Sequence, residues 1–226
     1  MEFTVRGPVL NALGRCARRF FPAAFKHRIL KMPTLQTERL ALRPFDHKDL
    51  GEIAAWEEIA TAQNSGAAAQ EFLDYCLREY RERGIGPWAI RSNETGSIVG
   101  NCGFPEINFK EHRGEVNCYI APPYRSRGLA TEALMSLFAF GFAEIGLTRI
   151  QARVDLDNFS SQRLAEKAGM KFVGFLEPAP SLKNAGAKQK LYSILRSEIR
   201  VGNDPTVRFS VKTERPGPAT GPGDRT

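Results

Sequence analysis

A short basic turn, Arg125-Ser-Arg-Gly-Leu-Ala130, carries the residue types that bind a phosphate group. It follows an alternating apolar segment and precedes a long apolar run, so a strand is expected to end and a helix to begin here. The first backbone amides of a helix have no partner within the helix, and the helix dipole favours negative charge beside them. Gly128 allows a ligand to approach closely, and the flanking arginines add positive charge. The pattern therefore predicts a phosphate site at this turn.

The elements that must position this turn can be read from apolar periodicity. The alternation in residues 34–44 predicts a first strand, and Asp46 followed by Asp49 indicates the start of a helix. A stretch of small residues at 61–69 is expected to separate this helix from a second one, which Gly84 ends. Three strands at 88–91, 98–104 and 115–120 are then predicted to form an antiparallel meander. After the turn, the pattern predicts a helix at 129–144, a strand at 148–154, a helix at 161–168 capped by Ser160 or Ser161, and strands at 171–176 and 191–195.

Length and charge restrict the class of protein. The 226 residues include 42% apolar and 25% charged residues, as in ordinary globular domains, and the apolar run at 134–143 is too short for a membrane span. The net charge of +7 comes mostly from residues 1–31, which hold seven basic residues and one acidic residue. Residues 32–202 hold equal numbers of each sign. A basic groove for nucleic acid is therefore not expected.

These observations also suggest a domain organisation. Residues 1–31 are interpreted as a basic extension outside the core, either a targeting segment or sequence upstream of a start at Met32. Residues 32–202 form the predicted domain, and the tail at 203–226, rich in Pro, Gly and charge, is expected to be disordered. The four cysteines and three histidines are widely spaced, so neither a disulfide framework nor a metal site is expected, and a cytoplasmic location fits.

The order of elements around the turn resembles the GNAT superfamily of acetyl-CoA-dependent N-acetyltransferases. The family signature Arg/Gln-x-x-Gly-x-Gly/Ala is matched at 125–130, and its downstream half is matched by Asn158-x-x-Ser161 and by Lys167-Ala-Gly-Met170. The opening sequence at 34–44 resembles the RimJ/RimL branch, which acetylates the N-termini of ribosomal proteins. The resemblance covers about residues 34–196. It implies an α+β fold in which helices flank a mixed, mostly antiparallel central sheet with splayed strands.

The resemblance also implies how acetyl-CoA is held. Backbone groups of Tyr119 and Ile120 would pair with the pantetheine arm as an added strand, and Asn158 would donate a hydrogen bond to it. A helix cap is the alternative role for Asn158. The pyrophosphate would lie against the backbone amides of the turn, namely Arg125, Ser126, Arg127, Gly128, Leu129, Ala130 and Thr131.

Direct acetyl transfer needs a base for the amine and a proton donor for the leaving thiolate. Glu115 is the candidate base, because alternation places it on the same strand face as Tyr119; a solvated charge is the alternative. Many family members carry a tyrosine seven residues after the asparagine, but Ala165 occupies that position here. Ser161 is the remaining nearby hydroxyl, with helix capping as its alternative role, and Tyr192 is a more distant candidate.

The sequence thus predicts an N-acetyltransferase that moves an acetyl group from acetyl-CoA to a primary amine, either a peptide N-terminus or a small amine. The acceptor is its expected partner, and a homodimer is compatible with the family. The lysines of Lys188-Gln-Lys190 suggest either a basic rim that suits an acceptor with nearby carboxylates or only a solvated edge. The missing tyrosine and a short segment between the first two helices motivate the alternative, an acyl-CoA-binding module with little turnover.

Overall fold

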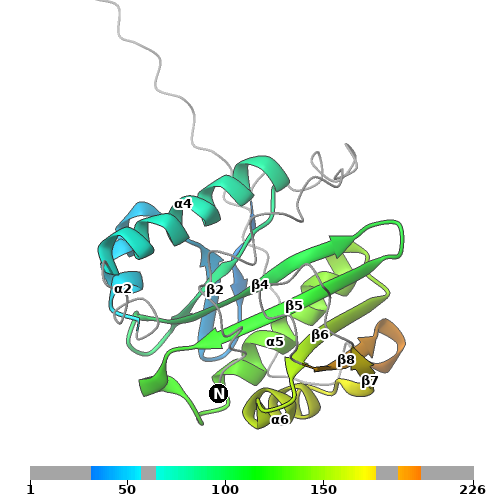
Figure 1. Cartoon of the computed structure of the whole chain (residues 1–226). Helices are drawn as coiled ribbons and strands as arrows, with labels where there is room; N and C mark the ends of the chain where they lie inside the picture. Colours follow the sequence, from blue (N-terminus) through cyan, green and yellow to red (C-terminus); the bar gives the residue numbers. More distant parts are fainter. Residues whose placement is uncertain (1–31, 57–64, 177–187, 200–226) are drawn as a thin grey trace, which may run out of the picture.

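The computed structural model describes residues 32–56, 65–176 and 188–199 (Figure 1). The predicted basic extension at 1–31 and the predicted tail at 203–226 lie outside these residues. The described part contains one mixed sheet with helices on both sides, which confirms the predicted fold class.

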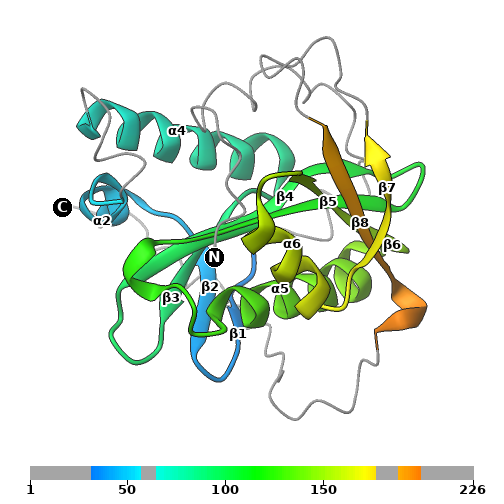
Figure 2. The ribbon, with the colours of Figure 1, turned by 60° about the horizontal axis from the view of Figure 1, so that its bottom comes forward.

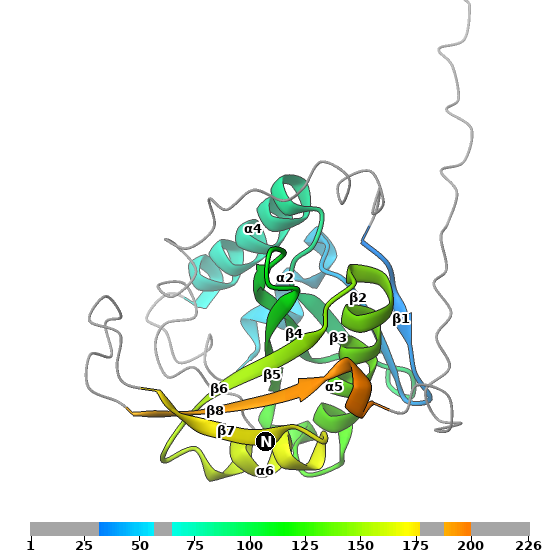
Figure 3. The same cartoon turned by 90° about the vertical axis from the view of Figure 1, so that its right-hand side faces the viewer.

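The sheet has eight strands in the order β1-β2-β3-β4-β5-β6-β8-β7. All neighbouring strands are antiparallel except β5 and β6, which are parallel. The predicted meander is confirmed as β3, β4 and β5, and Figure 3 shows β8 between β6 and the edge strand β7. The strands are β1 (Leu35–Gln36), β2 (Leu40–Pro44), β3 (Trp88–Ser92), β4 (Ile98–Asn108), β5 (Arg113–Ile120), β6 (Arg149–Asp155), β7 (Lys171–Leu176) and β8 (Gln189–Leu195).

Helices cover the two faces of the sheet, α2 and α4 on one face and α5 and α6 on the other (Figure 2). Each face has its own apolar core. The larger core contains most of α5 together with β5 and β6, and the smaller one contains an aromatic cluster of Phe45, Trp56 and Phe72. The helical segments are η1 (His47–Asp49), α2 (Leu50–Ala54), α4 (Ser65–Arg83), η2 (Pro122–Tyr124), α5 (Leu129–Phe140), the π-helical η3 (Gly141–Ile145), α6 (Phe159–Lys167) and η4 (Arg196–Glu198).

Helix starts account for most of the differences from the sequence predictions. The predicted start at Asp46 is confirmed, because Asp46 and Asp49 form a reciprocal capping box. Helix α4 begins inside the stretch predicted to be a separator, since its alanines are strong helix formers. Helix α6 begins at Phe159 with Asn158 as its N-cap, so the prediction that Ser160 or Ser161 caps it is wrong.

Only a short part of β5 and β6 is paired in the parallel ladder between them. Residues 113–115 pair with residues 149–151, and neither strand pairs with the other beyond that point. In Figure 1 the two strands separate from this junction towards the turn that follows β5. A parallel strand pair that stops after three residues leaves backbone donors and acceptors facing a gap, which an extended ligand can occupy. We call the junction at Glu115 and Gln151 the apex of the gap.

Candidate functional site

The predicted phosphate turn has the conformation that its sequence requires. Gly128 is the N-cap of α5 and adopts a left-handed backbone with φ of 78°, which favours glycine. The first helical hydrogen bond joins the Glu132 amide to the Gly128 carbonyl at 3.2 Å. The amide of Arg125 already donates to the Pro122 carbonyl at 3.2 Å, so it is not available to a ligand. Within the described residues, the amides from Ser126 to Thr131 have no backbone acceptor.

The two arginines of the turn each pack on an aromatic ring. Arg125 Nε donates to the Ile120 carbonyl at 2.8 Å, and its guanidinium lies 5.8 Å from the centroid of the Tyr119 ring. The Arg127 guanidinium lies 5.9 Å from the centroid of the Tyr124 ring. Both side chains therefore contribute positive charge next to the turn.

A small cavity of about 50 Å³ lies directly against the turn. Besides residues of the turn, Leu164 and Lys167 of α6 line it. Lys167 belongs to the downstream motif, where no role was predicted for it, and Leu164 lies outside that motif. The Lys167 ammonium makes no ion pair with any described residue. A cation on the last turn of α6 thus faces the free helix N-terminus of α5. Together the two elements surround a space suited to a diphosphate.

The backbone of β5 presents alternate residues to the gap. The Ala121 amide donates to the Val99 carbonyl of β4 at 2.9 Å. Along an antiparallel ladder, hydrogen-bonded residue pairs alternate with pairs that are not hydrogen-bonded. Tyr119 and Asn101, two residues further along, are therefore again a hydrogen-bonded pair. Tyr119 therefore points its backbone groups at Asn101 of β4 and not into the gap. The prediction that Tyr119 pairs with pantetheine is corrected on this ground. Cys118, which the sequence analysis missed, faces the gap together with Ile120.

Asn158 lies three residues beyond the end of β6 and caps α6, which is the alternative role predicted for it. Its Oδ1 accepts hydrogen bonds from the Ser161 amide and from Ser160 Oγ, both at 3.0 Å. Among the described residues its Nδ2 has no acceptor. The oxygen thus caps α6 and fixes the amide plane, while the nitrogen is left to donate to a ligand.

Glu115 lies at the apex, and its carboxylate is partly buried. Oε2 lies 3.0 Å from Nε of Arg153 on β6. Burial raises the pKa of Glu115, and the nearby Glu106 adds to this, while Arg153 opposes the rise. A carboxylate with a raised pKa at the end of a ligand gap is typical of a general base.

Ser161 is buried on the first turn of α6, with 1% of its surface exposed. Its Oγ has no hydrogen-bond partner within the described chain. Ala165 follows one turn later on the same buried helix face. The hydroxyl of Tyr192, the more distant candidate, donates to Glu166 of α6 at 3.2 Å.

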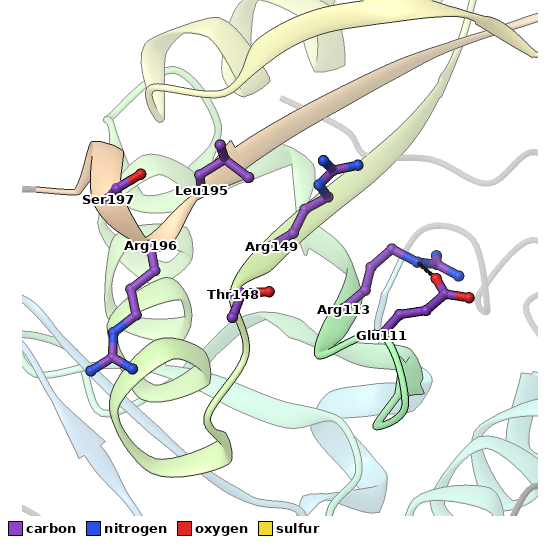
Figure 4. A pocket seen from close by; sticks show the side chains of 7 residues that line it. All are labelled: Glu111, Arg113, Thr148, Arg149, Leu195, Arg196 and Ser197. Atoms are coloured by element: carbon purple, nitrogen blue, oxygen red, sulfur yellow. Dashed lines mark hydrogen bonds and ion pairs between the residues drawn. The ribbon is translucent and has the colours of Figure 1, made fainter.

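A wide groove of about 780 Å³ lies at the ends of β5, β6 and β8, beside the apex. Arg113 and Arg149 occupy one cross-strand pair, two residues before the Glu115–Gln151 pair, and in Figure 4 both side chains extend to the same side. Arg113 is paired with Glu111 at 2.9 Å, whereas exposed Arg149 makes no ion pair with any described residue. The groove is lined by Glu111, Arg113, Thr148, Arg149, Leu195, Arg196 and Ser197.

In the part of the chain that the structure describes, no three potential metal ligands lie together, and every helix is too short or too polar to span a lipid bilayer. Cys76, Cys102 and Cys118 are free and buried.

Comparison with known proteins identifies the family. A model of the acetyltransferase (GNAT) domain matches residues 39–171. The uncharacterized N-acetyltransferase YoaA of Bacillus subtilis (strain 168) is 27% identical over 173 residues, which cover 73% of this chain and 97% of that protein. Spermidine N(1)-acetyltransferase of Escherichia coli (strain K12) is 31% identical over 150 residues, covering 64% of this chain and 78% of that protein.

The solved structures agree on the fold. Mycobacterium smegmatis RimJ in complex with CoA-disulfide superposes with a TM-score of 0.62 at 21% identity, covering 74% of this chain and 89% of that one. The family match includes the phosphate turn, both strands of the gap and α6. This chain belongs to the GNAT acetyltransferase family and is an acetyl-CoA-dependent N-acetyltransferase.

Proposed function

We propose that this enzyme acetylates the N-terminus of a peptide or a small amine, with acetyl-CoA inserted between β5 and β6. The observation that carries the proposal is the early end of β5–β6 pairing at Glu115, with open amides at one end of the gap and a carboxylate at the other. The RimJ/RimL type of acceptor and a cytoplasmic location form part of the proposal. The opening sequence at 34–44 supports the first, and the free buried cysteines support the second.

Different residues of the gap would bind the pyrophosphate and the pantetheine arm of acetyl-CoA. Amides from Ser126 to Thr131, together with Lys167, would hold the pyrophosphate. Backbone groups of Cys118 and Ile120 would bond to the pantetheine arm from one side, and Asn158 Nδ2 from the other. These positions bring the thioester towards the apex.

The reaction needs two proton transfers. Glu115 takes a proton from the amine, directly or through water, as the nitrogen forms a bond to the thioester carbonyl carbon. The carbon–sulfur bond then breaks, and the electron pair leaves with the sulfur. Ser161, the buried hydroxyl one turn from Ala165, donates a proton or a hydrogen bond to that thiolate.

The groove beside the apex suggests the chemistry of the acceptor. Lys190, one of the two lysines of the expected basic rim, donates to Gln162 at 2.7 Å and lies over the Phe172 ring. Among the described residues that line the groove, Arg149 and Arg196 make no ion pair, and Arg149 lies on the same strand face as Arg153, which pairs with Glu115. An amine acceptor with a carboxylate one or two residues away would pair with Arg149, whereas a polyamine such as spermidine would be repelled.

Substitution of Gly128 tests the phosphate site. Gly128→Val is expected to weaken acetyl-CoA binding at least tenfold in calorimetry, because a branched side chain opposes the left-handed backbone that leaves the amides of the turn open. Gly146→Val is the matched control. Gly146 has a similar φ of 81°, has no neighbour within 4 Å of an added Cβ, and lies outside the gap. Equal affinity of both variants for acetyl-CoA would show that the turn is not part of the binding site.

The pH dependence of kcat/KM tests Glu115. Only the deprotonated carboxylate can accept a proton, so activity should fall as the pH drops through a pKa above the ordinary value for glutamate. Glu115→Gln should lower kcat roughly 10²-fold, abolish this acid limb and leave acetyl-CoA affinity unchanged. A variant with a normal rate and the same pH profile would show that Glu115 is only a partner of Arg153.

Two buried serines allow a matched test of the proton donor. Ser161→Ala should lower kcat about 10²-fold with little change in the KM for acetyl-CoA, because the thiolate loses its donor. Ser136→Ala in α5 removes another buried hydroxyl that has no partner among the described residues, and it should leave kcat unchanged. The assignment fails if the two variants have the same rate.

An acceptor panel tests the reaction itself. Release of free thiol from acetyl-CoA and mass spectrometry of the products should show transfer to peptides with acidic residues near a free N-terminus, in preference to basic peptides and spermidine. Arg149→Glu should reduce this preference roughly tenfold, while Arg163→Glu on α6 should not change it. Tight binding of acetyl-CoA without transfer to any amine in the panel would favour the acyl-CoA-binding module instead.

A further inference from the structure

The loop between β1 and β2 is attached to the first turn of α5 through one carboxylate. Glu132 accepts a hydrogen bond from the Thr37 hydroxyl at 2.6 Å and from the Arg39 amide at 2.9 Å. Arg39 Nε donates to its second oxygen at 2.6 Å, and the two side chains form an ion pair. This cluster joins residues more than ninety positions apart in the sequence. It lies one helical turn from the amides that face the ligand gap.

The same arginine also reaches the phosphate turn. Arg39 Nη1 donates to the Arg127 carbonyl at 2.9 Å, and an added Cβ on Gly128 would lie 3.5 Å from Nη2. The described residues contain no cis peptide bond, so the N–H of Gly128 points opposite to the Arg127 carbonyl. A hydrogen bond that fixes this carbonyl on the Arg39 side therefore directs the Gly128 amide to the opposite side of the peptide plane.

Glycine makes such a restraint necessary. The peptide preceding a glycine rotates easily, because glycine tolerates both signs of φ. Without a fixed carbonyl, the Arg127–Gly128 peptide could turn its oxygen towards the ligand, where it would repel a phosphate. The rigid fork of a guanidinium can hold Glu132 and the Arg127 carbonyl at once, which the single ammonium of a lysine cannot do in the same geometry.

We propose that Arg39, held in place by Glu132, is a positioning residue that keeps the Gly128 amide turned towards the pyrophosphate of acetyl-CoA. The inference rests on the proposed binding of acetyl-CoA at this turn. It assigns a binding role to a residue outside the turn, in the loop before the second strand, and it gives Glu132 an indirect role through Arg39. Arg39 also compensates the negative charge of Glu132, which lies close to where the phosphates would bind.

The test compares two acetyl donors. Arg39→Ala should lower kcat/KM for acetyl-CoA about tenfold, and its calorimetric Kd should rise by the same factor. Turnover of S-acetylpantetheine, which has the thioester but no pyrophosphate, should change less than about twofold. Arg39→Lys should resemble Arg39→Ala, since it keeps the charge and loses the fork.

Two controls separate positioning from folding and from charge. Arg43→Ala removes a comparable bidentate pair, with Asp49 in η1, away from the turn, and it should leave the ratio of the two donors unchanged. In the double variant Arg39→Ala/Glu132→Gln, the uncompensated charge is gone but the carbonyl is still unrestrained. Its affinity for acetyl-CoA should remain about tenfold weaker than that of the wild type.

Each outcome decides between the roles. Recovery of wild-type affinity in the double variant would show that Arg39 acts only as a counter-charge, and equal losses with both donors would show a general structural defect; either result overturns the inference. If the wild-type protein bound no acetyl-CoA, the proposed function would fail, and this inference with it. Wild-type binding together with unchanged Arg39 variants would overturn the inference alone.

Discussion

The site depends on one missing set of hydrogen bonds. β5 and β6 pair over residues 113–115 and 149–151 and then separate, so the backbone of Cys118 and Ile120 faces a gap where an extended ligand can bond as an added strand. The buried faces of both strands remain in the large core under α5 and α6, which keeps them apart without a direct ladder. The gap is thus held open by packing, and it ends at the carboxylate of Glu115.

The phosphate turn lies at one end of this gap, and two of its backbone groups, the Arg125 amide and the Arg127 carbonyl, already have hydrogen-bond partners within the protein. Arg125 uses its amide in the short turn after β5 and its guanidinium on the Ile120 carbonyl. Arg39 takes the Arg127 carbonyl on the side away from the ligand. The amides that follow are left unpaired at the positive end of the α5 dipole. Lys167 adds a positive charge from the neighbouring helix, so charge and donors converge on one small space.

Much of this arrangement could be predicted from the sequence, and the exceptions have physical reasons. Alternation in residues 115–120 and the glycine at 128 indicated the strand, the left-handed turn and the helix, since each is encoded within a few neighbouring residues. Tyr119 was assigned to the wrong side because strand pairing with β4, which is not local, decides where its backbone points. Lys167 and Arg39 were missed for the same reason: each reaches the turn only through the packing of distant elements. The acceptor groove likewise depends on register between three strands.

Amide hydrogen exchange with and without coenzyme A tests the central claim most directly. If the ligand bonds to the turn and to the gap-facing edge of β5, the amides from Ser126 to Thr131 and that of Ile120 should become protected on binding. The amides of Tyr119 and Arg125, which already have acceptors within the protein, should change little. Binding of coenzyme A that protects a different set of amides, and leaves Gly128 exchanging as before, would contradict the account.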